Sequence, residues 1–170
     1  MWLSILQTSL IPRSLHPRPS TRDYNIWVDT FSGFGIGLLW NGSWDSWHTN
    51  NNWRGIPGEE CDIGWLEAIT VKLTICLIHT KGIQNTDVLI RSDNEGVIQA
   101  FCKGRSRNHM VNACIHWSES ILSNFNLSIT LIFVPLESNL ADPISLSWGI
   151  YPHHSLRLSS PPSLPPEIMQ

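Results

Sequence analysis

The stretch from Asp87 to Ala100, DVLIRSDNEGVIQA, constrains the fold more than any other part of this chain. Its apolar run Val88-Leu89-Ile90 ends at Arg91-Ser92-Asp93, and a second apolar pattern begins at Val97. The stretch therefore predicts a buried strand, a sharp turn and a helix. In an open α/β sheet, functional side chains gather where the carboxyl ends of strands meet the following loops, so Asp93 is a candidate site residue. The alternative interpretation of Asp93 is an ordinary helix N-cap.

The composition indicates a single globular domain. The chain has 170 residues, of which 42% are hydrophobic and 15% charged, enough for one domain with its own core. Eleven Lys and Arg against fourteen Asp and Glu give a net charge of -3, so no global positive field attracts nucleic acid. Binding to a polyanion would have to be local or mediated by metal. The four cysteines show no CxxC pair and no zinc-finger spacing, which predicts reduced thiols.

The sequence shows no strong targeting signal, and its two ends differ in composition from the middle. No apolar run approaches the roughly 20 residues that cross a bilayer. The N-terminus lacks the basic region and the cleavage site of a secretory signal. We therefore expect an intracellular protein without a membrane partner, and a monomer. Residues 1–22 are predicted to be a linker or the end of an upstream segment, 23–149 a folded domain, and 150–170 a disordered tail rich in Pro and Ser.

The folded region predicts three antiparallel strands and then alternating helices and strands. Strands are expected over 25–29, 35–40 and 43–48, and Asn41-Gly42 is a strong hairpin signal because both positions must take positive φ. A helix capped by Asp62 is expected over 63–80, a strand over 87–92, helices over 95–102 and 108–124, and a strand over 128–134. A last short helix should begin at Asp142-Pro143, with Asp142 as its N-cap.

Four acidic residues are expected to converge in this arrangement. A helical crossover to a fourth strand parallel with the first places Asp29 and Asp93 on neighbouring strands. Glu67 lies on an apolar stripe of the first helix, where a carboxylate is costly without a partner. Asp142 can reach the same place from the last helix. Converging carboxylates repel one another, and the usual relief is divalent metal, most naturally one or two Mg²⁺.

Taken together, these motifs resemble the type 1 ribonuclease H fold, and most closely the ribonuclease H domains of retroelement reverse transcriptase polyproteins such as those of fungi. The resemblance covers Tyr24 to Ser147. Its motifs are Val28-Asp29-Thr30 with the glycines that follow, Trp65-Leu66-Glu67-Ala68, Ser92-Asp93-Asn94 and Asn139-Leu140-Ala141-Asp142. It implies an α/β, ribonuclease H-like fold with a mixed five-stranded sheet, three antiparallel strands then two parallel, and helices on both faces.

The resemblance also implies a reaction and its metal ligands. The reaction would be endonucleolytic hydrolysis of the RNA strand of an RNA–DNA hybrid, with Mg²⁺ or Mn²⁺, two ions, as cofactor. Asp29, Glu67 and Asp93 would be the inner ligands, and Asp142 the more mobile fourth. One metal would lower the pKa of the attacking water, and the other would stabilise the leaving 3′ oxygen.

Contacts to the nucleic acid are expected from amide and basic side chains near these acids. The expected residues are Asn94, Asn139, Lys103, Arg105 and Arg107. The 2′-hydroxyls would distinguish RNA from DNA. For the basic residues after Gly104, an ordinary solvated loop is the alternative interpretation.

Several features depart from the family pattern. The loop Phe133–Ser138 has no histidine, although many relatives carry one there for proton transfer or product release. Ser145-Leu146 stands where retroelement relatives often carry Ser-Arg, and a large basic insertion and the polymerase portion are missing. A second hypothesis is therefore a catalytically inactive, nucleic-acid-binding remnant of the same fold. A third keeps the fold but assigns it to another class of nuclease or to an integrase.

Overall fold

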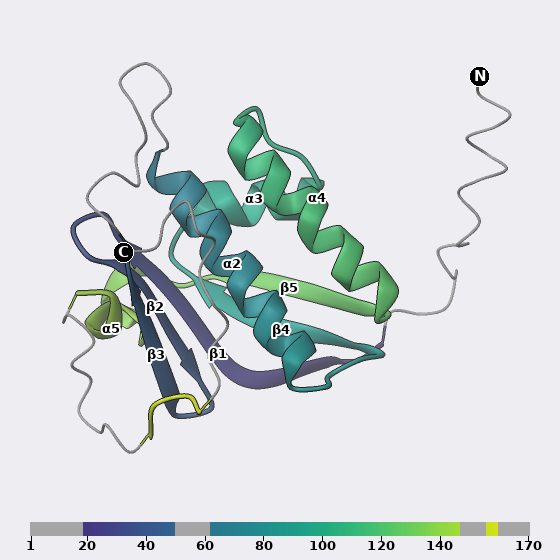
Figure 1. The fold of residues 1–170 in the computed structure, drawn as a ribbon, viewed down its shortest axis with the longest axis horizontal. Helices are drawn as coiled ribbons and strands as arrows, with labels where there is room; N and C mark the ends of the chain where they lie inside the picture. Colours follow the sequence, from purple (N-terminus) through teal and green to yellow (C-terminus); the bar gives the residue numbers. More distant parts are fainter. Residues whose placement is uncertain (1–18, 50–61, 147–155, 160–170) are drawn as a thin grey trace, which may run out of the picture.

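The structure is a computed structural model that describes residues 19–49, 62–146 and 156–159 (Figure 1). Residues 1–18 of the predicted linker, and 150–155 and 160–170 of the predicted tail, lie outside this part. The strands are β1 (Thr21–Phe31), β2 (Gly35–Trp40), β3 (Ser43–His48), β4 (Thr86–Ser92) and β5 (Leu127–Phe133). The helices are α2 (Ile63–Thr80), α3 (Glu95–Lys103), α4 (His109–Asn124), the 3-10 helix η1 (Leu136–Ser138) and α5 (Asp142–Leu146).

The five strands form one mixed sheet in the order β3-β2-β1-β4-β5. β1 pairs antiparallel with β2, and β2 pairs antiparallel with β3. β4 pairs parallel with both β1 and β5. This confirms the predicted α/β class with three antiparallel strands followed by two parallel ones, and it places β1 and β4 side by side at the centre of the sheet.

Local sequence signals account for the antiparallel half. Asn41 and Gly42 both have positive φ, 47° and 83°, as the predicted hairpin turn requires. β1 begins at Thr21, earlier than predicted, so the linker prediction is wrong for Thr21 and Arg22. Both residues pair with β4, and an irregularity between Arg22 and Ile26 then shifts the register. The early start of β1 thus depends on its pairing with β4, which is distant in the sequence.

Helices cover both faces of the sheet, because neighbouring residues of a strand point to opposite sides. Val28 of β1 packs in a buried cluster with residues of α2 such as Ile75 and Ile78. The adjacent Trp27 instead packs against a cluster that contains Ile144 of α5. Figure 1 shows α2 and α4 crossing the sheet on one side, with α5 beside β2 and β3. The main core therefore lies between the sheet and α2, and α5 covers the opposite face.

Helix α2 is unusually apolar because it lies at the centre of this core. Its N-cap is Asp62, whose side chain accepts a hydrogen bond from the Trp65 N–H, as the sequence predicts. Within the described segments it is the one helix long and apolar enough, by length and composition alone, to cross a membrane. However, 67% of that window is buried inside the protein, and core helices pass the same test. Packing accounts for its composition.

A short C-terminal segment, residues 156–159, docks against β3. The Leu158 N–H donates a hydrogen bond to the Trp44 carbonyl oxygen at 2.8 Å, and Trp44 forms a parallel bridge with Arg157. The Leu158 side chain is only 8% exposed. The prediction of a disordered tail is therefore wrong for these four residues, because β3 is an edge strand that offers unpaired backbone groups to them.

Candidate metal centre

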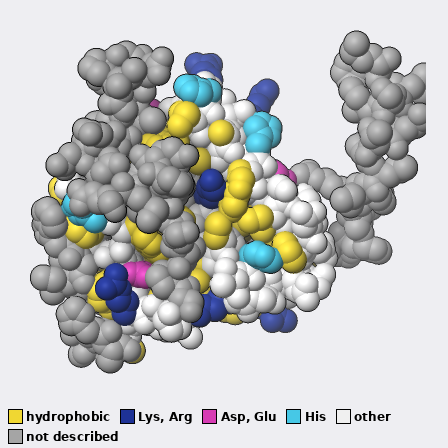
Figure 2. Space-filling model, viewed as in Figure 1, with side chains coloured by type: hydrophobic (Ala, Val, Ile, Leu, Met, Phe, Trp, Pro, Cys, Tyr) yellow, Lys and Arg dark blue, Asp and Glu magenta, His cyan; other side chains and the backbone are white. Residues whose placement is uncertain are grey.

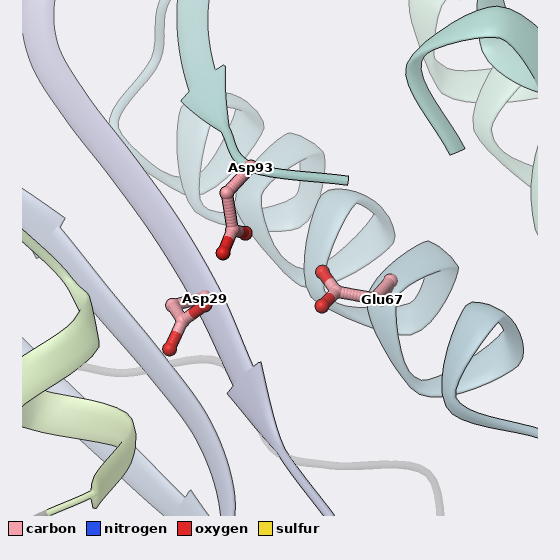
Figure 3. A group of neighbouring side chains, drawn as sticks. All are labelled: Asp29, Glu67 and Asp93. Atoms are coloured by element: carbon pink, nitrogen blue, oxygen red, sulfur yellow. The ribbon is translucent and has the colours of Figure 1, made fainter. Parts of the chain in front are cut away.

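Three carboxylates from separate elements converge at the carboxyl end of β1 and β4 (Figure 3). Asp29 comes from β1, Glu67 from α2, and Asp93 from the turn after β4. Each offers one oxygen atom, and these three oxygens all lie within 4.8 Å of one another. In Figure 3 the three carboxyl groups point into a common space between the strand and the helix. The structure thus brings together three of the four predicted ligands in one compact group.

Asp29 is held in place from the face that α5 covers. It is 3% exposed, and the hydroxyl of Ser145 in α5 donates a hydrogen bond to its Oδ2 atom. Gly37 lies opposite Asp29 on β2. A Cβ atom at Gly37 would lie 2.7 Å from the Ser145 nitrogen and 2.9 Å from the Ala141 carbonyl oxygen. Only glycine therefore lets α5 lie close enough for Ser145 to reach Asp29.

Glu67 enters from the opposite side, on α2. The side chain is 5% exposed and lies among the apolar residues of the helix, as its position on an apolar stripe predicts. The pKa of Glu67 is raised to about 8, mainly by burial, with the charges of Asp29 and Asp93 acting in the same direction and the Thr30 side chain acting against it. A carboxyl group in this position needs either a proton or a cation to be stable.

Asp93 is not the N-cap of α3. The neighbouring Asn94 takes that role, since its side-chain oxygen accepts a hydrogen bond from the Val97 N–H at 3.0 Å. The capping interpretation of Asp93 is therefore wrong. Its Oδ1 atom is instead buried without a hydrogen-bond partner in the described part of the chain. Buried carboxylate oxygens are normally hydrogen-bonded, so this unsatisfied oxygen beside two further carboxylates could take part in holding a metal ion.

The charge balance of this centre favours a cation. Burial raises the pKa of Asp29 to about 7, and the charges of Asp93 and Asp142 contribute in the same direction, against hydrogen bonds from Ser145 and the Thr30 backbone. Neither of the ion pairs Arg91–Asp23 and Arg157–Asp45 involves the centre, and no positively charged group is among the causes that shift the pKa of Asp29 or Glu67. Within the described residues, the three carboxylates thus have no identified protein counterion.

The donor set fits a hard divalent cation. Mg²⁺ binds oxygen ligands at about 2.1 Å, so two oxygens on one ion lie about 3 Å apart when adjacent and about 4 Å apart when opposite. Separations of up to 4.8 Å need only small side-chain movements to meet this geometry. The three residues could thus hold a metal ion, with carboxylate oxygens as its ligands.

Asp142 lies at the margin of this group. It is the first residue of α5, and not the residue before the helix as predicted, and its side chain is partly buried. Burial raises the pKa of Asp142, and the charge of Asp93 adds to this rise. Asp142 also raises the pKa of Asp29. Asp142 is therefore near both acids without belonging to the compact group of three, and its role as a fourth ligand stays a prediction.

Two of the predicted nucleic-acid contacts have structural roles. Asn139 is 4% exposed; its Nδ2 donates to the Val28 carbonyl oxygen at 3.0 Å, and its Oδ1 accepts from the Ala141 N–H at 3.1 Å. Both ends of its amide therefore tie the loop before α5 to β1, and a contact of Asn139 with nucleic acid stays a prediction. The side-chain oxygen of Asn94 is likewise occupied by the cap of α3.

The three predicted basic residues remain exposed. Lys103 ends α3, and Arg105 and Arg107 follow in the link to α4. Asn108, the N-cap of α4, donates a hydrogen bond through Nδ2 to Oδ2 of Asp62 at 3.1 Å. This contact places the end of the basic link at the N-terminus of α2, about 8 Å along the helix axis from Glu67.

Two residues that support the centre were not identified from the sequence. Ser145 carries no signal of its own, since serine in a short helix is common and its partner Asp29 is 116 positions away. Gly37 was recognised only as part of a glycine-bearing strand. A search for glycines in a strand register opposite a candidate ligand could have singled it out.

The chain was compared with protein-family models, with curated proteins and with solved structures, and none of these matches it.

Proposed function

We propose that this protein is a metal-dependent nuclease of the ribonuclease H type, which hydrolyses the RNA strand of RNA–DNA hybrids. The observation that carries the proposal is the convergence of Asp29, Glu67 and Asp93 on a buried, unsatisfied carboxylate oxygen. The order of the five strands supports a ribonuclease H-like fold. The resemblance of the sequence motifs to retroelement ribonuclease H domains supplies the substrate.

The three carboxylates would hold Mg²⁺ or Mn²⁺, and Asp142 would contribute from the margin. When bound, two such ions supply a more acidic water and stabilise the charge that develops on the leaving 3′ oxygen. The protein's own contribution is placement. Ser145 orients the Asp29 carboxylate, and burial on a long helix holds Glu67. Because Asp29 and Glu67 have raised pKa values, they must release protons when a cation binds, so metal affinity should rise with pH.

Recognition of the hybrid would depend on few charges. Figure 2 shows the Lys and Arg side chains of the described residues as small separate groups on the face in view, including some at the upper edge. Lys103, Arg105 and Arg107 are the basic residues nearest in the chain to the N-terminus of α4 and its contact with α2. We assign them to phosphate contacts, with the 2′-hydroxyls of the RNA strand providing discrimination against DNA.

A cleavage assay tests the proposal. Purified protein is mixed with Mg²⁺ or Mn²⁺ and an RNA–DNA hybrid labelled on the RNA strand, with duplex DNA as substrate control. Short RNA fragments are expected from the hybrid alone. Asp93→Asn should abolish cleavage while circular dichroism stays unchanged. Asp23→Asn is the matched control. Asp23 is also an acid of β1, but it forms an ion pair with Arg91 and is not part of the group of three carboxylates.

The same assay separates the two hypotheses that share this fold. An unmodified protein that binds the hybrid and leaves the RNA intact with either ion would be the inactive remnant that the missing loop histidine suggests. Cleavage that persists in Asp93→Asn would contradict the proposed site.

A further inference from the structure

The C-terminal segment, residues 156–159, contacts β3 through a specific charged anchor. Asp45 is 1% exposed, and its Oδ1 atom accepts hydrogen bonds from the Ser46 N–H at 2.8 Å and from Nε of Arg157 at 3.0 Å. Its Oδ2 atom is buried without a hydrogen-bond partner. Removing a partner from a buried charge is strongly destabilising. Arg157 is thus needed to compensate Asp45, and the segment has a definite place on the edge of the sheet.

The same arginine also covers Trp44. The guanidinium of Arg157 lies 5.6 Å from the centre of the Trp44 ring, within the range of a cation–π contact. Trp44 is 0% exposed, and it belongs to a cluster with Leu39 and Ile144 of α5. The Trp44 side chain therefore contacts both Arg157 of the C-terminal segment and Ile144 of α5, the helix beside the metal centre.

Helix α5 depends on such outside contacts for its position. It has only five residues, too few for its own hydrogen bonds to stabilise it. Ile144 packs on Trp44, the next residue Ser145 donates its hydrogen bond to Asp29, and Asp142 begins the helix. A displacement of Ile144 would move Ser145 and Asp142 together with it.

We propose that the segment 156–159, and Arg157 in particular, is a positioning element for the metal centre. It acts through Trp44 and α5 on Ser145 and Asp142. This inference rests on the proposed function, because it assumes that the carboxylates bind metal. Arg157 touches neither the carboxylates nor the substrate, so its effect should be on how tightly the centre holds its cation.

The test measures Mg²⁺ and Mn²⁺ binding to the full chain by calorimetry, well below the Tm of every variant. Arg157→Ala should weaken binding by about fivefold, the lower end of typical coupling between separate sites. Leu122→Ala is the matched control. Leu122 is a buried core residue of α4, so its truncation lowers the Tm without contacting α5 and should leave the metal affinity unchanged.

A double-mutant cycle identifies the route. Ser145→Ala should itself weaken binding, and adding Arg157→Ala should then cost less than it does in the unmodified protein, because both changes release the same contact to Asp29. Fully additive effects would show that Arg157 does not act through Ser145. An Arg157→Ala protein with unchanged affinity and a lowered Tm would show that the segment only stabilises the fold, and would overturn the inference.

Hydrogen exchange tests the positioning of α5 independently of whether the protein binds metal. If the unmodified protein binds neither ion, the proposed function fails. The positioning of α5 is then judged by the hydrogen exchange of its amides. The N–H groups of Ile144 and Ser145 both donate to the Ala141 carbonyl oxygen, and they should exchange faster in Arg157→Ala. The amides of β4 should keep their exchange rates. Equal exchange in α5 would overturn the inference in that case as well.

Discussion

Asn94 caps helix α3, and the adjacent Asp93 turns its side chain towards Asp29 and Glu67 instead. Both residues are good N-caps, yet they have different roles. The division of roles leaves the Oδ1 atom of Asp93 buried and unsatisfied beside two more acids. The turn after β4 therefore both starts a helix and adds a carboxylate to the acidic group.

Asp93→Asn should abolish the response to divalent metal. In the unmodified protein, Mn²⁺ should raise the Tm, since a ligand that binds only the folded state stabilises it. In Asp93→Asn we expect no such rise, together with a slightly higher Tm without metal, because one of three mutually repelling charges is removed. Differential scanning fluorimetry with and without metal measures both effects. An undiminished metal shift in this variant would contradict the assignment of Asp93 as a ligand.

The stability of the metal-free protein should fall as pH rises from about 4 to about 8. The pKa values of Asp29 and Glu67 in the folded chain, about 7 and about 8, lie above their ordinary values of 3.8 and 4.5. The folded state therefore holds these protons more tightly, and the stability this contributes is full below pH 3.8 and lost as pH passes 7 and 8. At about 1.4 kcal/mol per pKa unit, each of the two shifts corresponds to a loss of a few kcal/mol.

The pH prediction is checked by Tm measurements in the presence of a chelator. Glu67→Gln removes one of the two ionisations, so its Tm should depend less on pH than that of the unmodified protein. Added Mg²⁺ should stabilise the unmodified protein more at high pH than at low pH, because its ligands must first lose their protons. If the stabilisation by Mg²⁺ were independent of pH, neither Asp29 nor Glu67 would bind the ion.

Gly37→Ala should weaken metal binding without a charge change at the centre. The added Cβ would lie 2.7 Å from the Ser145 nitrogen, so α5 must move away from β2 and take the Ser145 hydroxyl with it. We expect a loss of about 1–3 kcal/mol in stability, as for overpacked cores, and a lower affinity for Mn²⁺. Leu122→Ala in α4 is the control, because it lowers the stability of the core without a change next to α5. Equal metal affinity in both variants would speak against the packing argument.

Asn139→Ala should destabilise the protein rather than simply weaken substrate binding. The buried amide bonds to the Val28 carbonyl oxygen and to the Ala141 N–H, and losing one partner of such a bond costs about 1–3 kcal/mol. Chemical denaturation measures this loss, with the exposed Asn124→Ala as control. If Asn139→Ala kept full stability and lost only affinity for the hybrid, Asn139 would be a nucleic-acid contact and not a structural residue.

Replacing Lys103, Arg105 and Arg107 by glutamine should weaken hybrid binding uniformly across sequences. Each phosphate contact that is lost should reduce the slope of log K against log salt by about one. Fluorescence anisotropy at several salt concentrations measures this slope, and the metal-induced rise in Tm should stay unchanged. An unaltered slope would identify the link as an ordinary solvated loop.

Much of the candidate centre was predictable because its acids lie on strongly patterned elements. The apolar stripe of α2 marks Glu67 as buried, and the strand-to-helix transition marks the turn with Asp93. Asp29 and Asp93 come together because β1 and β4 are parallel neighbours, which the order of predicted elements already suggests. Three of the four acids accordingly form the group that the sequence predicts.

Other features could not be decided from the sequence, because neighbouring residues were locally equivalent or their partners lie far away in the chain. Asp93 and Asn94 have similar capping preferences, and only the backbone path after β4 decides which side chain faces the helix. Asn139 looks like an exposed polar residue in a loop, but β1 passes close enough to bury it and to accept its hydrogen bond. The docking of residues 156–159 depends on the edge of β3, more than a hundred positions earlier in the chain.

The sequence by itself determined the local features: the Asn41-Gly42 turn, the start of α2 at its Asp62 cap, and the acidic residues at the ends of apolar elements. These follow from backbone preferences and from hydrophobic periodicity, which act over a few residues. The tertiary structure alone decided that Ser145 reaches Asp29 across Gly37, and that Arg157 anchors the chain beside Trp44. Such contacts depend on sheet register and on the closeness of helix packing, which no short stretch of sequence specifies.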